Sequence, residues 1–387
     1  MTTPQIGIHD LSIATTHYRL DHIELARHSG VDADKYLLGI GQEQMSVAAA
    51  DEDIVTMAAA AAAPIIERHG AESIRTVLLA TETGVDQSKS AALFLHPLIG
   101  LPHTARVVEL KQACYSATAA LQFATGLIAC HPDQRVLVIA TDIAKYELDS
   151  AAEATQGAAA AAMLVSADPA ILRLEPESGV YSTDIMDFWR PNYRDTAVVD
   201  GKLSIEAYLH AIEMAWQDYR GRGGRDIAEF AAFCYHQPFT KMAFKAHRHL
   251  LRVNDATADD AAVLAAIDDT TRYNRLVGNS YTASLYLALA ALLDHRGDLT
   301  DQPIALISYG SGCVAEFVSG VVLPGYQDHL RTAANNAAIS GRKPVDYARY
   351  RDLHDEPPTP GRPIPEESNG PYRLTAVTDH KRLYSTH

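Results

Sequence analysis

The sequence predicts a layered α/β protein made of two similar halves. Short runs rich in Val, Ile and Leu alternate with longer Ala-rich stretches, which is the pattern of strands and helices that stack in layers. Two predicted helices are apolar on every face, which indicates burial, and each begins just after a polar residue, Cys114 or Asn279. An apolar strand follows each helix at a similar interval. We therefore predict a duplicated unit whose buried helices open toward one site, although Ala-rich helices also resemble one another through composition alone.

The predicted elements follow one another regularly along the chain. Continuous apolar runs favour central strands that are covered on both faces, and they span residues 76–80, 106–110, 135–140, 161–165 and 304–308. Helices are predicted at residues 52–68, 116–129, 204–219, 239–252 and 281–295. The Pro-rich stretch 357–365 predicts a surface connection, and residues 372–384 are apolar enough for an edge strand or a clasp.

Composition argues against several classes of protein. The 387 residues carry a formal net charge of −15, which repels a nucleic-acid backbone, so we expect no nucleic-acid partner. Any phosphate-bearing ligand then needs a local basic patch. No charge-free apolar run reaches about 18 residues, and residues 1–20 lack the features of a signal peptide, so we expect neither a membrane span nor secretion. The four scattered cysteines favour reduced thiols in the cytoplasm.

Cys114 is the strongest chemical signal. It follows an apolar strand and precedes a buried helix, whose N-terminal partial charge favours a thiolate and whose backbone N–H groups suit a developing oxyanion. The alternative is a buried cysteine that acts as a small hydrophobic residue. Cys130 and Cys313 lie among apolar residues, and for them we expect that second role.

Two further residues suit proton transfer. His236 stands in the sequence YHQPF, where Pro238 fixes a turn between an apolar strand and a helix, and an imidazole there exchanges a proton near neutral pH. Glu82 follows a strand in the sequence TETG, where burial in a cleft raises a pKa toward that of a useful base. A structural histidine and an exposed loop carboxylate are the corresponding alternatives. Cys234 and His236 lack the further ligands that a zinc site needs, so we expect no metal.

Six separated motifs resemble those of 3-hydroxy-3-methylglutaryl-CoA synthases of the bacterial mevalonate type. In chain order they are TETGVDQSKS, ELKQACYSATAALQFA, STDIMDFWRPNY, YHQPFTKMAFKAH, GNSYTASLYLALAALL and SYGSGCVAEF. The resemblance extends from Gly7 to the region of Tyr384. It implies a thiolase-like fold, with two duplicated α/β halves in an α-β-α-β-α arrangement, and a homodimer.

The resemblance also implies roles for individual residues. Cys114 matches the acylated nucleophile, Glu82 the general base, and His236 the group that binds and polarises the acetoacetyl carbonyl. Glu82 and Cys114 fall in an N-terminal half, residues 1–166, and His236 falls with Asn279 in a C-terminal half, residues 167–387. Further matches are expected to contact the substrates or support the site: Asp142, Tyr146, Thr155, Asp187, Phe188, Asn279 and Ser311, together with Lys241 and Lys245 near the CoA phosphates.

The activity implied is the condensation of acetyl-CoA with acetoacetyl-CoA and water to 3-hydroxy-3-methylglutaryl-CoA and CoA, through an acetyl group on Cys114 and without a cofactor. This reaction belongs to the mevalonate pathway of isoprenoid synthesis. One alternative is a synthase of the same fold that adds a methyl branch to a polyketide on an acyl carrier protein. The other is an inactive thiolase-fold subunit that serves as a partner. The motif around Phe188 and the two lysines favour the CoA enzyme, and the three intact catalytic residues argue against an inactive subunit.

Overall fold

In the described part of the chain, nine strands form one hydrogen-bonded sheet, and a short junction between β1 and β8 divides it into two parts, here called the first and the second sheet. The computed structural model describes residues 5–355 and 361–387, and its main hydrogen-bonded strand order is β11-β12-β13-β8-β1-β7-β6-β4-β5. Only two residue pairs, Gly7 with Arg173 and Ile8 with Leu172, join β1 to β8. The sheet before this junction consists of β1 (Gly7–Thr15), β4 (Ile74–Ala80), β5 (Arg106–Leu110), β6 (Arg135–Ile143) and β7 (Ala158–Ser166). The sheet after it consists of β8 (Leu172–Ser182), β11 (Ala232–Tyr235), β12 (Pro303–Gly310) and β13 (Val314–Val322).

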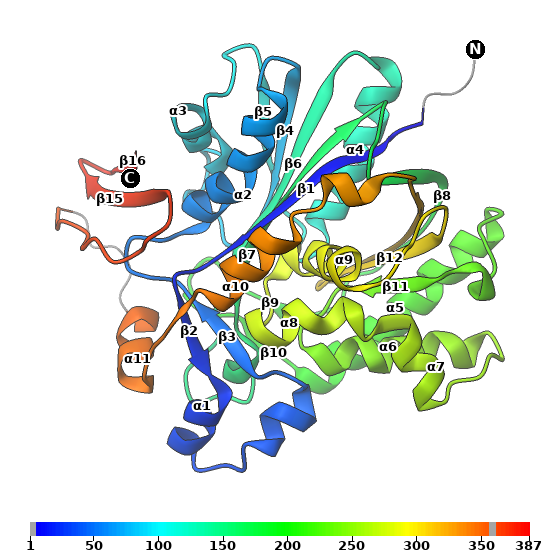
Figure 1. Cartoon of the computed structure of the whole chain (residues 1–387). Helices are drawn as coiled ribbons and strands as arrows, with labels where there is room; N and C mark the ends of the chain where they lie inside the picture. Colours follow the sequence, from blue (N-terminus) through cyan, green and yellow to red (C-terminus); the bar gives the residue numbers. More distant parts are fainter. Residues whose placement is uncertain (1–4, 356–360) are drawn as a thin grey trace.

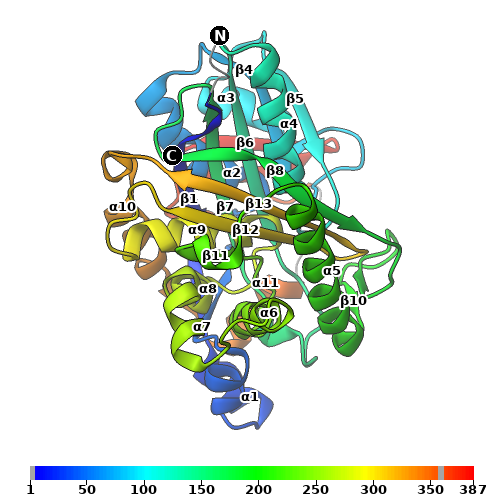
Figure 2. The same cartoon turned by 90° about the vertical axis from the view of Figure 1, so that its right-hand side faces the viewer.

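Helices cover both outer faces and fill the space between the sheets. The central helices α4 (Ser116–Cys130) and α9 (Ser284–His295) pack against the inner faces, α4 on β4 and β6, and α9 on β1, β11 and β12. Helix α2 (Ile54–His69) covers the outer face of the first sheet, and α5 (Gly201–Gly221) covers that of the second. Figures 1 and 2 show α9 enclosed within the molecule, while α5, α6 (Thr240–Val253) and α7 (Asp260–Ile267) lie at its periphery. This is the predicted α-β-α-β-α arrangement.

Alternation along each central strand divides its side chains between two cores. In β4, Leu78 and Ala80 join the core that holds α4 and α9, whereas Val77 and Leu79 join the core beneath α2. A third core lies beneath α5 and α6 (Thr240–Val253). Since both faces of such a strand are buried, its sequence is apolar at every position, which is why the prediction from continuous runs is confirmed for β4, β6, β7 and β12.

The same prediction is wrong for β5. This strand is the last in the sheet order, and Arg106 and Val108 are exposed, because only β4 pairs with it among the described residues.

A second correction concerns the helix that follows. By length and composition the segment Ala113–Cys130 suits a membrane span, which the sequence analysis overlooked. The segment contains α4, whose buried side chains lie in the core between the sheets, and core helices of this kind pass the same test.

Segments from the C-terminal end pack on the N-terminal half. Strand β14 (Lys343–Pro344) pairs with β2 (Tyr18–Asp21), and the hairpin β15–β16 (Tyr372–Thr378, Lys381–Thr386) lies beside α2, as Figure 1 shows at its left. The Tyr384 hydroxyl donates to Asp53 Oδ2 at 2.6 Å. Residues 372–384 therefore form a clasp. Of the predicted Pro-rich connection, Pro357, Pro358 and Pro360 lie outside the described residues.

The remaining elements are short or peripheral. The helices are α1 (His22–Ser29), α3 (Leu95–Ile99), α7 (Asp260–Ile267), α8 (Arg272–Val277), α10 (Thr332–Ser340) and α11 (Tyr347–Asp355). The strands are β3 (Gln44–Val47), β9 (Phe188–Trp189) and β10 (Val198–Val199). Single turns of π or 3-10 helix are η1 (Lys35–Ile40), η2 (Ala91–Phe94), η3 (Glu153–Thr155), η4 (Ile227–Glu229), η5 (Asp269–Thr271), η6 (Tyr281–Ala283) and η7 (Tyr326–His329).

Truncation of one side chain in the central helix α9 tests this layering. Leu289 in α9 is 0% exposed between the sheets, so Leu289→Ala is expected to lower the free energy of unfolding by about 2–5 kcal/mol. Leu264 in α7 is 47% exposed, and the control Leu264→Ala is expected to change it by no more than about 0.5 kcal/mol. Urea unfolding measures both. Equal losses in the two variants would contradict a central position for α9.

Candidate active site

Cys114 sits in a tight loop between β5 and α4. The preceding residue, Ala113, has a φ of +43°, so the backbone turns sharply just before the thiol. Gly310 at the end of β12 packs against this loop, where a Cβ would lie 2.7 Å from Gln112 O and from Tyr115 N. Only glycine permits that approach. The first half therefore provides the Cys114 loop, and the second half holds it in place.

Glu82 faces Cys114 from the end of β4. The Cys114 Sγ donates a hydrogen bond to Glu82 Oε1 at 3.0 Å. Burial and the nearby Asp142 raise the pKa of Glu82 to about 8, and burial together with Glu82 raises the pKa of the Cys114 thiol well above its ordinary value. The predicted thiolate is therefore wrong for this resting arrangement. Helix α4 begins only at Ser116, and the facing carboxylate outweighs its partial charge.

Asp142 ties the Glu82 loop to the second half. Its buried carboxylate, at the end of β6, accepts hydrogen bonds from the Glu82 N–H at 2.9 Å and from the hydroxyl groups of Thr81 and Thr83. It also accepts from the N–H and hydroxyl of Thr282 in η6. Burial raises the pKa of Asp142. Because Asp142 is 0% exposed and its hydrogen bonds are all internal, it positions the Glu82 loop and does not make the predicted contact with a substrate.

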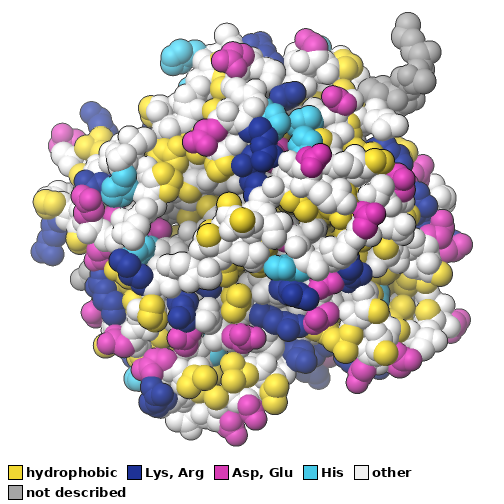
Figure 3. Space-filling view, viewed as in Figure 1, with side chains coloured by type: hydrophobic (Ala, Val, Ile, Leu, Met, Phe, Trp, Pro, Cys, Tyr) yellow, Lys and Arg dark blue, Asp and Glu magenta, His cyan; other side chains and the backbone are white. Residues whose placement is uncertain are grey.

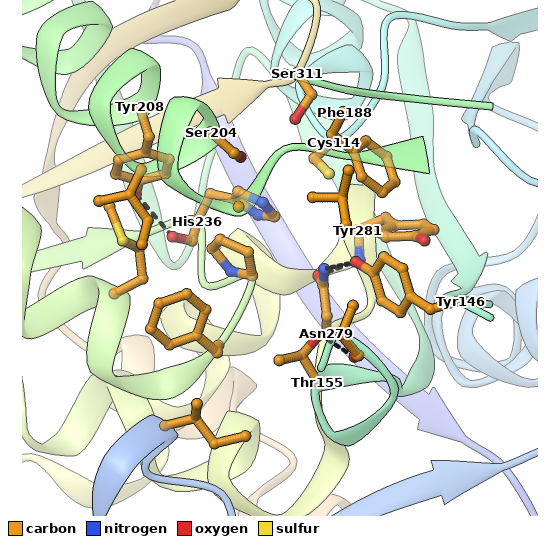
Figure 4. Close-up of a pocket in the computed structure, with 18 of the residues that line it drawn as sticks. Cys114, Tyr146, Thr155, Phe188, Ser204, Tyr208, His236, Asn279, Tyr281 and Ser311 are labelled. Atoms are coloured by element: carbon orange, nitrogen blue, oxygen red, sulfur yellow. Dashed lines mark hydrogen bonds between the residues drawn. The ribbon is translucent and has the colours of Figure 1, made fainter. Parts of the chain in front are cut away.

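A cavity of about 400 Å³, here named the acyl cavity, has Cys114 and His236 in its lining. Figure 4 shows both side chains together with Asn279, Tyr146, Phe188 and Ser311 around one space, with Thr155 at its lower edge. Most of its walls are apolar or aromatic, with a few polar groups between them, which suits a small acyl group on an extended chain. The structure thus brings together residues that lie far apart in the sequence.

His236 presents an unpaired nitrogen in this cavity. The residue follows β11 and is 2% exposed, and its Nδ1 has no hydrogen-bond partner within the described part of the chain. The Tyr208 hydroxyl donates to the His236 carbonyl at 2.8 Å and fixes the turn. Burial lowers the pKa of His236 to about 3, so the imidazole is neutral at physiological pH. A neutral imidazole here offers a hydrogen bond to a substrate oxygen instead of a full positive charge.

Aromatic side chains form the wall beside Cys114. The rings of Tyr146, Phe188 and Tyr281 contact one another edge-on or tilted, with centroids 5.8–6.2 Å apart. Asn279 donates through Nδ2 to the Tyr146 hydroxyl at 3.3 Å, and it accepts from the Tyr281 N–H. Tyr281 was missed by the sequence analysis, although it belongs to the quoted motif GNSYTAS. Tyr208 and Thr282 were also missed, because their roles arise from contacts across the fold.

Besides Asp142, three predicted binding residues do not line the acyl cavity. Asp187 is buried and accepts hydrogen bonds from the Tyr309 hydroxyl at 2.7 Å and from the Gly312 N–H at 2.8 Å, so it supports the loop that holds Ser311. Lys241 and Lys245 lie on α6 beside the cavity-lining Phe239 and Met242. Their Nζ atoms lie 5.1 Å from the ring of Phe244 and 5.5 Å from that of Phe239, and neither lysine forms an ion pair among the described residues.

Charge elsewhere is mixed on the face seen in Figure 3, where Lys and Arg side chains are interspersed with Asp and Glu. That face offers no continuous basic surface for a nucleic acid. In residues 5–355 and 361–387, no group of three or more His, Cys, Asp or Glu side chains is arranged to hold a metal ion. All four cysteines are free, and Cys130 is exposed, unlike the buried residue we expected.

Replacement of Asp142 tests its effect on the pKa values of Glu82 and Cys114. Asp142→Asn removes a negative charge that raises the pKa of both Glu82 and Cys114, so alkylation of Cys114 by iodoacetamide is expected to reach its midpoint at a lower pH. An amide also leaves donors unpaired, at a cost of about 1–3 kcal/mol in stability. The control Asp187→Asn removes another buried carboxylate and should leave the midpoint unchanged. Equal midpoints in the wild type and Asp142→Asn would contradict the assignment.

Known proteins resemble this chain over nearly its whole length. Two family models match: hydroxymethylglutaryl-coenzyme A synthase N terminal, over residues 3–170, and C terminal, over residues 174–274 and 260–342. The hydroxymethylglutaryl-CoA synthase of Enterococcus faecalis is 42% identical over 98% of this chain and 99% of its own length. The polyketide biosynthesis 3-hydroxy-3-methylglutaryl-ACP synthase PksG of Bacillus subtilis is 34% identical over 90% of this chain and 87% of its own.

Solved structures agree with these sequence matches. An HMG-CoA synthase complexed with CoA has a TM-score of 0.94 and 37% identity, and covers 99% of this chain and 100% of its own. MvaS in complex with 3-hydroxy-3-methylglutaryl coenzyme A has a TM-score of 0.90 and 37% identity, and the match covers 99% of each chain. The curacin pathway HMG synthase in complex with holo donor-ACP has a TM-score of 0.92 and 31% identity, and the match covers 99% of this chain and 100% of its own. The predicted family and its thiolase-like fold are therefore confirmed: the chain belongs to the hydroxymethylglutaryl-CoA synthase family.

Proposed function

We propose that this chain condenses acetyl-CoA with acetoacetyl-CoA and water to give 3-hydroxy-3-methylglutaryl-CoA and CoA, as the enzyme of the mevalonate pathway. The observation that carries the proposal is the contact of 3.0 Å between Cys114 Sγ and Glu82 Oε1 beside a cavity that also contains His236. The identity of 42% to a CoA synthase, against 34% to a carrier-protein synthase, favours free CoA thioesters as substrates.

The first step places an acetyl group on Cys114. Because the pKa of the thiol is raised, the sulfur loses its proton only as it attacks the acetyl carbonyl. The carbon–sulfur bond of acetyl-CoA then breaks, and the CoA thiolate takes up the proton. The acetyl group remains on Cys114, against the aromatic wall formed by Tyr146, Phe188 and Tyr281.

The second step forms the carbon–carbon bond. Glu82 removes a proton from the acetyl methyl group, and the resulting nucleophile attacks the C3 carbonyl of acetoacetyl-CoA. His236 donates a hydrogen bond to the oxygen that becomes an alkoxide, and the proton held by Glu82 neutralises it. Water then cleaves the thioester at Cys114. The neutral state of His236 supports a hydrogen-bonding role over that of a full acid.

The remaining assignments follow from the site and from the family. Asn279, Thr155 and Ser311 line the acyl cavity and are proposed to contact the substrates, and Lys241 and Lys245 on α6 are proposed to bind the CoA phosphates. This chemistry requires no cofactor or metal. The free cysteines support a cytoplasmic enzyme. A homodimer is proposed from the family resemblance alone.

Removal of the sulfur tests the nucleophile. Cys114→Ala is expected to abolish transfer of radiolabel from acetyl-CoA to the protein and to reduce turnover by at least about a thousandfold. Cys313→Ala, which removes a buried thiol outside the acyl cavity, should retain both activities. Labelling of Cys114→Ala at the wild-type level would refute the assignment.

Neutralisation of Glu82 separates the steps. Glu82→Gln removes the charge that raises the pKa of Cys114, so the variant is expected to become acetylated, yet it lacks the base for condensation. Single-turnover assays that start from acetyl-enzyme should show at least about a hundredfold slower formation of product. A block already at acetylation would contradict the proposed role.

The pH profile reports the same base. Glu82 acts as a carboxylate, and its pKa is raised to about 8, so condensation from preformed acetyl-enzyme is expected to accelerate as the pH rises through about 8 and to slow as Glu82 is protonated below it. A rate that does not change between about pH 6 and about pH 9 would contradict a raised pKa at the catalytic base.

A further inference from the structure

A second cavity reaches the active site and is lined by different residues. It has a volume of about 760 Å³ and is here named the polar cavity. Its walls come from the loop that follows Glu82, from the edge strand β5, and from the segment around Phe188 and Asn192. Polar and charged side chains predominate in its lining, in contrast to the aromatic acyl cavity: Asp86, Gln87, Ser88, Lys89, Glu109, Lys111, Gln112, Arg190 and Asn192.

The two cavities meet at the catalytic pair. The acyl cavity has Cys114 in its lining but not Glu82, whereas the polar cavity has Glu82 but not Cys114. Phe188 and Ser311 line both, and Figure 4 shows these two side chains next to Cys114 at one end of the acyl cavity. The hydrogen bond of 3.0 Å from Cys114 to Glu82 therefore crosses from one cavity to the other.

As a residue, Glu82 is more exposed than Cys114. Cys114 is only 7% exposed, while Glu82 retains intermediate exposure as part of the polar cavity wall. Arg190, in the same wall, forms no ion pair within the described residues and favours the carboxylate form of Glu82 by lowering its pKa. The polar cavity thus leads to a base that can accept a proton.

The proposed reaction needs water at a moment when the acyl cavity is full. After condensation the product is still bound through sulfur to Cys114, and its CoA arm must leave through the acyl cavity, which measures about 400 Å³. Water that hydrolyses this thioester therefore needs another approach. A cavity of this size with many hydrogen-bonding groups holds water readily.

We propose that the polar cavity is the route by which water reaches the Cys114 thioester for the final hydrolysis. The inference rests on the proposed function and adds the path of its third reactant. The water oxygen bonds to the thioester carbon; the carbon–sulfur bond then breaks, and the Cys114 sulfur takes up the proton that the water loses. The released acid ionises to the carboxylate of the product.

Filling the polar cavity from two walls tests the route. Ser88 and Asn192 line it, and their side chains form no hydrogen bond within the described residues, so Ser88→Trp, Asn192→Trp and the double variant obstruct it without altering a catalytic residue. Ser29→Trp is the matched control, since Ser29 is an exposed serine at the end of α1 that lines neither cavity. Gel filtration and thermal unfolding check the assembly and folding of each variant.

The readout is the fate of the covalent intermediate. Each full-length protein is mixed with acetyl-CoA and acetoacetyl-CoA, quenched over time, and analysed by intact-protein mass spectrometry. The double variant is expected to acetylate at the rate of Ser29→Trp but to accumulate the 3-hydroxy-3-methylglutaryl-CoA adduct, with release slowed at least about tenfold. A double variant that acetylates normally and releases product at the control rate overturns the route.

If the double variant does not fold, the two single variants decide by the same criterion. Absence of 3-hydroxy-3-methylglutaryl-CoA from the wild-type reaction would be a different result, because it overturns the proposed function itself and not the water route alone.

Discussion

A thiol and a carboxylate held in contact away from bulk water are the constraint on which the site depends. Burial raises the pKa of both groups, and Glu82 raises that of the Cys114 thiol further, so the thiol keeps its proton in the resting protein. Such a pair is unfavourable in isolation, and the surrounding fold must hold it. Asp142 does so through donors from the Glu82 loop and from η6, which come from opposite halves of the molecule.

The duplicated architecture divides the chemistry between its halves. The first supplies the Glu82 carboxylate, our proposed base, after β4 and the Cys114 thiol after β5. The second supplies His236 after β11 and Asn279 before α9, which face the same cavity and suit a substrate carbonyl. Gly310 lets the end of β12 approach the Cys114 loop, because a Cβ at this position would collide with it.

Most of the fold could be predicted because burial on both faces leaves a local trace in the sequence. The runs that became β4, β6, β7 and β12 are apolar at nearly every position. Strand β5 is also rich in apolar residues, but its place at the edge depends on its neighbours, which a local run does not encode. The motifs similarly located Glu82, Cys114 and His236, whereas the wall formed by Tyr281 and the internal contacts of Asp142 required the fold.

The error about the thiol has the same origin. A helix N-terminus lowers a thiol pKa, and the sequence placed Cys114 before a helix; the opposing effect of Glu82 comes from a residue thirty-two positions away, brought to 3.0 Å by the fold.

The central claim is that this sulfur carries the acyl group. Peptide mapping by mass spectrometry after incubation with acetyl-CoA alone tests it most directly: the account predicts one acetyl group, on Cys114, that is lost when acetoacetyl-CoA is added and 3-hydroxy-3-methylglutaryl-CoA appears. An unmodified Cys114, or an acetyl group that acetoacetyl-CoA does not discharge, would contradict it.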